Sequence, residues 1–391
     1  MKFLIINTDY PEFLQGLYKN NPNLKNKSYE EQMQVRNESL FGVADFYSSN
    51  LRKLGHEAWD IHANNEFMQR AWARENGVKV RESSSTEQRW QNILRLGQGI
   101  LDRIPFRRVR SLFSPAIHLI DSWFYKILEE QVKFYKPDIL FNHAISEISP
   151  YFLNKMKPRI RLLMGQHAAT RLSDIEDFSH YDLFISSFPP TIDFFRQKGI
   201  PAELNRMGFE PKVLSILNSD VKNFDATFVG SFHSVHTSRV AFLETLCARL
   251  PQIKIWGNGI ERLSSISPIK KNYIGHAWGK EMYQILCKSK ITLNHHGDIP
   301  PYANNCRLYE ATGVGTLLIT DWKENLHEMF EPGKEVVAYR SAEECAELIK
   351  YYLDHDNELE TIASAGQERT LREHTYYQRM EELVDIVCKY I

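Results

Sequence analysis

Short runs of apolar residues alternate with polar loops and helix-length segments along the whole chain. The first run covers residues 2–7, a helical pattern follows over residues 38–54, and a second short run covers residues 56–61. Continuous apolar runs of this length are typical of strands buried in a parallel sheet. Further strand-like runs lie at residues 138–142, 161–164 and 183–186. The pattern predicts that the first half of the chain is a doubly wound parallel α/β domain.

The connection from the first strand to its helix, residues 8–29, is long compared with the few residues that usually join a strand to a helix. Loops of this length are either disordered or functional. We expect this one to be a flap that faces the acceptor side of a cleft.

The second half repeats the strand and helix alternation after an interruption. The first series stops at Gly208 and Pro211, and a new one starts at Asp225. Strand-like runs then follow at residues 226–229, 253–256, 290–294 and 316–320, and helical patterns at residues 239–250, 280–288, 305–312, 342–354, 357–369 and 376–390.

A chain of 391 residues is longer than one hydrophobic core usually supports, so two domains with a cleft between them are expected. We predict an N-terminal Rossmann-like domain over residues 1–205, a linker over 206–224 and a C-terminal Rossmann-like domain over 225–370. We also expect a C-terminal helix within residues 371–391, which could pack back on the N-terminal domain.

Composition narrows the class of protein. The formal net charge is −1, which removes the basic field that a general nucleic-acid binder needs. The five cysteines are widely spaced without a C-x-x-C pair, as expected in a reducing compartment. Neither a signal-peptide core nor an apolar stretch of membrane-spanning length is present. We therefore expect a cytoplasmic protein that does not bind nucleic acid.

Residues 85–136 alternate basic and apolar positions, which predicts amphipathic helices whose first part is basic. One interpretation is a helix pair packed on the sheet. The other is contact between the basic segment 95–125 and an anionic lipid headgroup or lipid-linked acceptor at the inner face of the membrane. The sequence leaves both open.

The most informative stretch runs from Asn294 to Asp321. A strand leads into a polar loop and then into a helix, whose first turn we expect Asn304 or Asn305 to cap. The free N–H groups of a helix start favour a diphosphate, and Arg307 could hold a phosphate oxygen there. Glu310 lies one turn further along and could accept hydrogen bonds from ribose hydroxyls. An intrahelical ion pair between Arg307 and Glu310 is the alternative interpretation.

Three blocks carry a family resemblance: R-L-Y-E-A-T-G-V-G-T-L-L-I-T-D, E-N-L-H-E-M-F-E-P-G-K-E-V-V-A-Y and R-E-H-T-Y-Y-Q-R-M. In this order they resemble the C-terminal domain of CgeB-like glycosyltransferases, which are related to the group-1 glycosyltransferases. The resemblance covers roughly residues 225–391. It implies a GT-B fold, in which two Rossmann-like domains face a central cleft. The first, residues 1–205, is then the acceptor domain, and the second, residues 225–370, binds the nucleotide sugar. Glu310 then matches the ribose-binding carboxylate, and Arg307 the basic residue before it.

The chain departs from the group-1 pattern at one position. Many group-1 enzymes carry a second glutamate where this sequence has Tyr302, eight positions before Glu310. His296, Gly297 and Asp298 are the nearest substitutes for contact with the donor sugar. A metal site would need more ligands than His296 and Asp298 supply, so we expect none.

Glycines follow two strands of the second domain at the edge where open α/β sheets bind ligands. Gly230 and Ser231, with Arg239 on the next helix, resemble the family's phosphate-side loop. Asn258 lies between two glycines after the next strand, where the backbone could approach the nucleotide base. A plain tight turn is the alternative at both places.

Candidate catalytic residues lie at strand ends of the first domain. His167 follows Gly165, whose lack of a side chain could let a substrate approach closely, and His143 ends the preceding strand. Either could contact the donor sugar or accept the acceptor's proton. Asp9 and Glu147 are alternative bases, and a structural histidine is the alternative interpretation throughout.

These observations predict a glycosyltransferase that moves a sugar from a nucleotide-diphosphate sugar, such as a UDP-sugar, to an acceptor hydroxyl in polysaccharide or glycoconjugate synthesis. The acceptor would be a saccharide, lipid-linked or protein group. The resemblance implies a metal-independent reaction without a further cofactor. The alternatives are a sugar-nucleotide 2-epimerase and a catalytically silent GT-B-like binding subunit.

Overall fold

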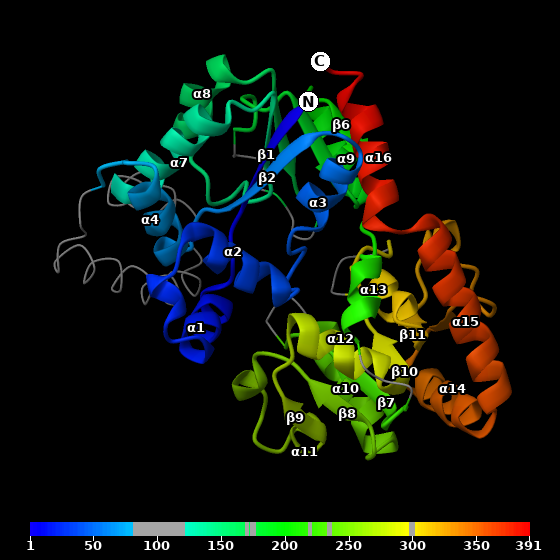
Figure 1. Cartoon of the computed structure of the whole chain (residues 1–391). Coiled ribbons are helices and arrows are strands. Elements are labelled where there is room, and N and C mark those ends of the chain that lie inside the picture. The colour runs from blue at the N-terminus through cyan, green and yellow to red at the C-terminus, as the bar shows by residue number, and fades with distance from the viewer. Residues whose placement is uncertain (81–121, 169–171, 173–176, 218–220, 233–236, 297–301) are drawn as a thin grey trace.

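The computed structural model describes residues 1–80, 122–168, 172, 177–217, 221–232, 237–296 and 302–391. Two parallel sheets, each of six strands in the described chain, form two halves of the molecule that lie one above the other (Figure 1). Helices cover both faces of each sheet, so the α/β, doubly wound prediction is confirmed.

The first sheet has the strand order β2-β1-β3-β4-β5-β6, with every neighbouring pair parallel. Its strands are β1 (Lys2–Asn7), β2 (Glu57–His62), β3 (Ile139–Asn142), β4 (Leu162–Gln166), β5 (Leu183–Ser186) and β6 (Ala202–Leu204). Its helices are α1 (Pro11–Asn20), η1 (Leu24–Asn26), α2 (Tyr29–Glu38), α3 (Phe46–Lys53), α4 (Glu66–Glu75), α7 (Ser122–Tyr135), α8 (Pro150–Met156), η2 (Lys157–Arg159) and α9 (Pro189–Gln197).

The second sheet has the order β12-β11-β10-β7-β8-β9 and is also parallel. Its strands are β7 (Phe224–Val229), β8 (Lys254–Trp256), β9 (Tyr273–Gly275), β10 (Ser289–Asn294), β11 (Leu317–Asp321) and β12 (Val337–Tyr339). The helices of this half are α10 (Thr237–Arg249), η5 (Ile260–Arg262), α11 (Ile269–Asn272), α12 (Gly279–Cys287), α13 (Arg307–Gly313), η6 (Leu326–Glu328), α14 (Ala342–Asp354), α15 (Asp356–Glu373) and α16 (Tyr376–Val387).

The central strand β1 explains why the apolar runs are continuous rather than alternating. Phe3 and Ile5 join the core on the side of α3, whereas Leu4 and Ile6 join the core on the side of α7 and α8. Successive side chains of a strand point to opposite faces, so a strand covered on both faces must be apolar at every position.

The two halves are joined by a connection and by the C-terminal helix. Residues 205–223 lie between the last strand of the first sheet and the first strand of the second, and include η3 (Pro211–Ile216). Helix α16 packs against α3 of the first half, and Tyr390 after it donates a hydrogen bond of 2.7 Å to Glu203 of β6 (Figure 1). The chain end therefore lies against the first half although the preceding helices α14 and α15 belong to the second.

Two predictions for the N-terminal region are wrong. Residues 8–29 are not an irregular flap, because they contain α1 and η1, and Phe13 and Leu17 of α1 are buried. Pro11 is the first residue of α1, where its missing N–H is not needed. The helical pattern over 38–54 is interrupted, because Leu40 and Ala44 have positive φ angles of 56° and 42° between α2 and α3.

Three strands were not predicted, namely β6, β9 and β12. Each is three residues long, as is β8, which was predicted because Ile253 before it and the glycines after it extend its signal. A run of three residues alone is too short for a pattern of apolar positions to distinguish it from a loop. Of the basic segment 95–125, residues up to 121 lie outside the described residues, so its expected membrane contact is not addressed by the structure. In the described ranges, no helix is both long and apolar enough to cross a bilayer.

Candidate functional site

The second sheet changes the direction of its strand order between β7 and β10. The chain continues from β7 to β8 and β9 on one side, while β10, β11 and β12 extend the other side. Open α/β sheets bind ligands at the carboxyl ends of the strands at such a point. Gly230 and Ser231 follow β7 there, and His295 and His296 follow β10. The topology thus brings together two loops that the sequence separates widely.

Arg239 of α10 ties these two loops together. Its Nη1 donates to the carbonyl oxygen of Ser231 at 3.1 Å, and its Nη2 donates to that of His295 at 2.8 Å. The side chain is buried. These hydrogen bonds hold the backbone of the two switch-point loops, and the predicted contact of Arg239 with phosphate stays a prediction.

The two predicted glycine turns pack against each other. A Cβ placed on Gly257 would lie 1.7 Å from the carbonyl oxygen of Gly230, so no larger residue fits at this position. The backbone N–H of Phe232 donates to the carbonyl oxygen of Asn258 at 2.8 Å, and the Asn258 side chain bonds to His276. The close approach that glycine permits here is between two backbones, as the tight-turn interpretation expects.

The predicted cap of α13 is wrong. The N-cap residue is Cys306, and its side chain makes no capping hydrogen bond. The Asn305 amide instead donates to Asn294 Oδ1 at 2.8 Å, and Asn304 contacts the first half of the molecule. Because α13 has only seven residues, few peptide dipoles add up at its start. The start of α13 by itself therefore gives little support to the predicted diphosphate contact.

Arg307 and Glu310 form an ion pair on the first turn of α13, with Arg307 Nη1 2.8 Å from Glu310 Oε2. Arg307 Nη2 also donates to the carbonyl oxygen of Val229 at 3.2 Å, which places the guanidinium at the end of β7. The two side chains are 13% and 10% exposed. The pair is therefore preformed at the switch point, and its roles toward phosphate and ribose stay predictions.

The loop before α13 bridges the two halves, which the sequence did not indicate. Asn304 accepts a hydrogen bond from Ser187 Oγ at 2.6 Å and donates to the carbonyl oxygen of Ala168 at 2.6 Å. The ring of Tyr302 meets that of Phe188 edge-on, with centroids 6.1 Å apart. Because Ser187 and Ala168 follow strands of the first sheet, the carboxyl edges of the two sheets face each other across this contact.

His296 is held by Asp321 at the end of β11. Its backbone N–H and its ring Nδ1 lie 3.0 Å and 2.6 Å from Asp321 Oδ1, and Lys323 Nζ lies 3.1 Å from Asp321 Oδ2. Burial works to raise the pKa of Asp321, but the hydrogen bond from His296 and the charge of Lys323 hold it well below its ordinary value. Gly297, the other predicted sugar contact on this loop, lies outside the described residues.

Asp9 follows β1 at the switch point of the first sheet, where β1 and β3 are neighbours. Its carboxylate is buried, with Oδ1 2.5 Å from Arg36 Nη2 and Oδ2 3.1 Å from His62 Nδ1. Burial opposes ionisation, yet His62 and Arg36 together hold the pKa of Asp9 well below its ordinary value. Such a carboxylate is a poor proton acceptor, and the geometry favours a structural role over the predicted catalytic one.

His143 follows β3 on the other side of the same switch point. Its ring lies edge-on to Phe141 and to Tyr47, with centroids 4.3 Å and 4.9 Å away. Burial lowers the pKa of His143 to about 3, so the ring is neutral at physiological pH and a weak general base. Glu147, the other candidate base, lies exposed on the turn that follows.

His167 is half-buried directly after β4, and its backbone N–H donates to Ile185 at 3.2 Å. It precedes Ala168, whose carbonyl oxygen accepts from Asn304, so it lies where the two halves meet. The reason given for preferring it does not hold, because a Cβ on Gly165 would lie 2.5 Å from the ring of Phe184. That glycine makes room for the core, not for a substrate.

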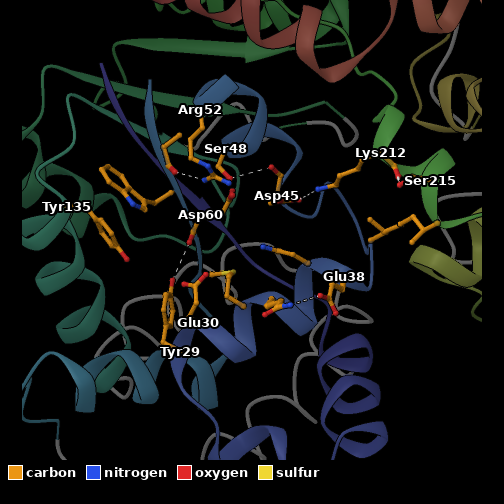
Figure 2. A pocket seen from close by; sticks show the side chains of 17 residues that line it. Tyr29, Glu30, Glu38, Asp45, Ser48, Arg52, Asp60, Tyr135, Lys212 and Ser215 are labelled. Carbon is orange, nitrogen blue, oxygen red and sulfur yellow. Dashed lines mark hydrogen bonds and ion pairs between the residues drawn. The ribbon is translucent and has the colours of Figure 1, made fainter. Parts of the chain in front are cut away.

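A cavity of about 750 Å³ lies elsewhere, between α2, α3, β2 and η3. Figure 2 shows Tyr29, Glu30 and Asp60 on one side of it and Lys212 with Asp45 on another. Its size suits a ligand. However, β2 contributes residues 58–60, which precede its carboxyl end, and no predicted site residue lines the cavity. The switch-point loops therefore remain the candidate site. In the described part of the chain, no three His, Cys, Asp or Glu side chains form a group that could hold a metal ion.

One family model matches part of the chain. Residues 239–385 match the family model described as glycosyl transferase-like, a segment that includes His296, Arg307 and Glu310. No curated protein matches the chain. The CgeB-like subfamily is not distinguished by these findings.

Solved structures define the class of fold. A glycosyltransferase from Rickettsia africae ESF-5 is 12% identical, with 98% of this chain and 97% of that one covered and a TM-score of 0.56. HepE from Anabaena, in complex with UDP and glucose, is 11% identical with both chains fully covered and a TM-score of 0.57. AviGT4, a glycosyltransferase involved in avilamycin A biosynthesis, is 12% identical, with 100% and 98% covered and a TM-score of 0.55. The fold is that of the GT-B glycosyltransferases.

Proposed function

We propose that this chain is a glycosyltransferase that transfers a sugar from a nucleotide-diphosphate sugar to an acceptor hydroxyl. The observation that carries the proposal is the preformed Arg307–Glu310 pair at the switch point, within the segment that matches the glycosyl transferase-like model. UDP is the first nucleotide to test, because HepE was solved with UDP and with UDP-glucose.

The pair suits a nucleotide diphosphate because it offers both charges at one place. The guanidinium of Arg307 attracts the diphosphate, and the carboxylate of Glu310 accepts hydrogen bonds from ribose hydroxyls. During transfer, the acceptor oxygen bonds to the anomeric carbon while the bond from that carbon to the diphosphate breaks. Arg307 would stabilise the negative charge that develops on the departing diphosphate.

His167 is the proposed contact on the opposite domain. It lies at the junction with Asn304, whereas Asp9 is committed to Arg36 and His143 is held neutral by burial. His167 would hydrogen-bond the donor sugar or receive the proton of the acceptor hydroxyl. The same proposal includes an acceptor that is a saccharide, lipid-linked or protein group, and a reaction that needs no metal ion. It also includes a role in polysaccharide or glycoconjugate synthesis. The proposed location is the cytoplasm, with membrane contact through residues 95–125.

Product analysis tests the proposed function. A thermal-shift screen of UDP, GDP and their sugars identifies the nucleotide, since a bound ligand raises the melting temperature by mass action. The full chain is then incubated with that nucleotide sugar and a panel of saccharide acceptors, with and without EDTA. Transfer releases nucleoside diphosphate and enlarges the acceptor. An isomeric nucleotide sugar would indicate the epimerase instead, and binding without any product would indicate a silent subunit.

A further inference from the structure

Asp321 anchors a hydrogen-bond network at the carboxyl ends of β10 and β11, and the network runs outward along two branches. The first branch is His296, whose backbone N–H and ring Nδ1 both lie within hydrogen-bond distance of Asp321 Oδ1. An ionised carboxylate can only accept, so Nδ1 must carry the proton. In the neutral imidazole this leaves Nε2 as an acceptor.

The second branch fixes the orientation of two amides. Thr320 Oγ1 lies 3.4 Å from Asp321 Oδ1 and accepts from Asn294 Nδ2 at 3.0 Å. Asn294 must therefore turn its Oδ1 the other way, where it accepts from Asn305 Nδ2 at 2.8 Å. The last atom of this branch is Asn305 Oδ1, which is again an acceptor.

Both outer atoms lack a donor. His296 Nε2 and Asn305 Oδ1 are buried atoms without a hydrogen-bond partner among the described residues, and His296 as a whole is 3% exposed. Buried polar atoms are nearly always hydrogen-bonded, so two unpartnered acceptors in one network indicate a missing donor. With the imidazole neutral, the carboxylate at the root of the network makes both outer atoms acceptors.

We propose that His296 Nε2 and Asn305 Oδ1 accept hydrogen bonds from two hydroxyl groups of the donor sugar, with Asp321 as a positioning residue acting through His296. The inference rests on the proposed function. A diphosphate is a poor partner for these atoms because its oxygens are themselves acceptors at neutral pH, whereas a sugar ring supplies O–H donors. Arg307 and Glu310 would hold the nucleotide, and this network would recognise the sugar.

The test compares UDP with UDP-glucose by calorimetry, using two replacements of His296. In His296→Asn the amide can still donate to Asp321, but it does not reach the position of Nε2. In His296→Gln the longer side chain can place an acceptor oxygen there. We expect His296→Asn to weaken UDP-glucose binding about tenfold and UDP binding less than twofold, and His296→Gln to recover most of the loss.

Two further measurements separate recognition of hydroxyls from a general packing effect. Asp321→Asn should lose UDP-glucose affinity as His296→Asn does, because the amide can donate to Nδ1 and thereby turn Nε2 into a donor. Deoxyfluoro analogues of UDP-glucose replace one O–H donor at a time. The wild type should bind the analogue modified at the contacted hydroxyl about tenfold more weakly, and His296→Asn should not discriminate against it.

Each outcome decides between the proposals. A wild-type chain that binds no nucleotide sugar would overturn the proposed function and this assignment together. Suppose that the wild type binds the nucleotide sugar. If His296→Asn then loses equal affinity for UDP and UDP-glucose, or loses none for either, this assignment alone is overturned. If EDTA abolishes UDP-glucose binding, His296 Nε2 and Asn305 Oδ1 bind a cation rather than sugar hydroxyls, which also overturns the assignment. Thermal melting of each variant excludes a folding defect.

Discussion

At the carboxyl edge of each sheet an aspartate contacts a histidine and a cation, but the surroundings of the two aspartates differ. At the first edge, Asp9 is enclosed by Arg36 and His62, and all three are buried. At the second edge, Asp321 also contacts a histidine and a cation, but the network continues to His296 Nε2 and Asn305 Oδ1, which lack donors among the described residues.

His62 Nε2 also lacks a partner among the described residues, so one unpartnered atom does not by itself distinguish the two edges. The edges differ in the cation and in the extent of the network. A buried guanidinium closes the Asp9 pair, whereas Asp321 faces the partly exposed Lys323 and roots a network that ends in acceptors of two different side chains.

The largest effect is expected for Asp9→Ala, which tests the structural role of Asp9 at the first edge. Removing the carboxylate leaves the Arg36 guanidinium buried without a counter-ion, which should lower the free energy of unfolding by about 3–5 kcal/mol. Urea denaturation measures the loss. The double variant with Arg36→Met should recover part of it, because both charges are then absent. Unchanged stability would contradict the structural role of this pair.

The second prediction concerns His167. We expect His167→Ala to lower kcat by about 100-fold while leaving affinity for the nucleoside diphosphate nearly intact, because the two contacts lie on opposite domains. Initial rates with the identified donor, together with calorimetry, measure the two effects. Wild-type turnover, or a variant that melts early and loses both properties together, would refute the assignment and direct attention to His143 and Glu147.

The third prediction tests the ion pair of the second edge. Arg307→Ala should weaken binding of the nucleoside diphosphate about 10- to 100-fold and that of the bare nucleoside far less, because only the phosphates interact strongly with the guanidinium. Calorimetry with UDP and uridine measures the difference. Arg249→Ala, which removes an exposed arginine of α10, is the matched control. Equal losses for both ligands would argue against phosphate contact.

Glu310→Ala is the companion variant. It should remain folded and should lose affinity for ribose-containing ligands by about tenfold, including uridine itself, since the carboxylate is assigned to ribose hydroxyls. If Arg307→Ala loses affinity mainly for UDP and Glu310→Ala loses affinity for uridine as well, the phosphate and ribose roles are separated. Unchanged affinity for both ligands in Glu310→Ala would leave the ion pair as a purely intrahelical contact.

The smallest expected effect is a pH dependence at the first edge. The unfolded chain protonates His143 near its ordinary pKa of about 6.5, whereas in the folded chain burial lowers that pKa to about 3. Acid therefore favours the unfolded state, and this contribution to stability is complete above pH 6.5 and lost progressively below it. Between pH 7 and pH 5 the wild type should lose about 1–2 kcal/mol more than His143→Phe. Parallel losses in urea denaturation would contradict the burial of this ring.

Local sequence determined the elements and much of the topology. The apolar runs of β1, β5 and β11 are visible because a strand covered on both faces is apolar over most of its length, and such a pattern needs no knowledge of the partner strands. Glycine, polar loops and helical periodicity indicated the division near residues 206–224 in the same way. The strands β6, β9 and β12, and the break between α2 and α3 at Leu40 and Ala44, carry too little periodicity to be found.

Side-chain partners were decided only by the tertiary structure. The sequence placed Asp9, His143, Arg239 and His296 at the carboxyl edges, but it could not show that Asp9 is neutralised by Arg36 or that Arg239 binds two backbone carbonyls. Those partners lie far apart in the chain, and a hydrogen bond depends on distances of a few tenths of an ångström. The same holds for Asn304, whose contacts with Ser187 and Ala168 exist only because two separate sheets face each other.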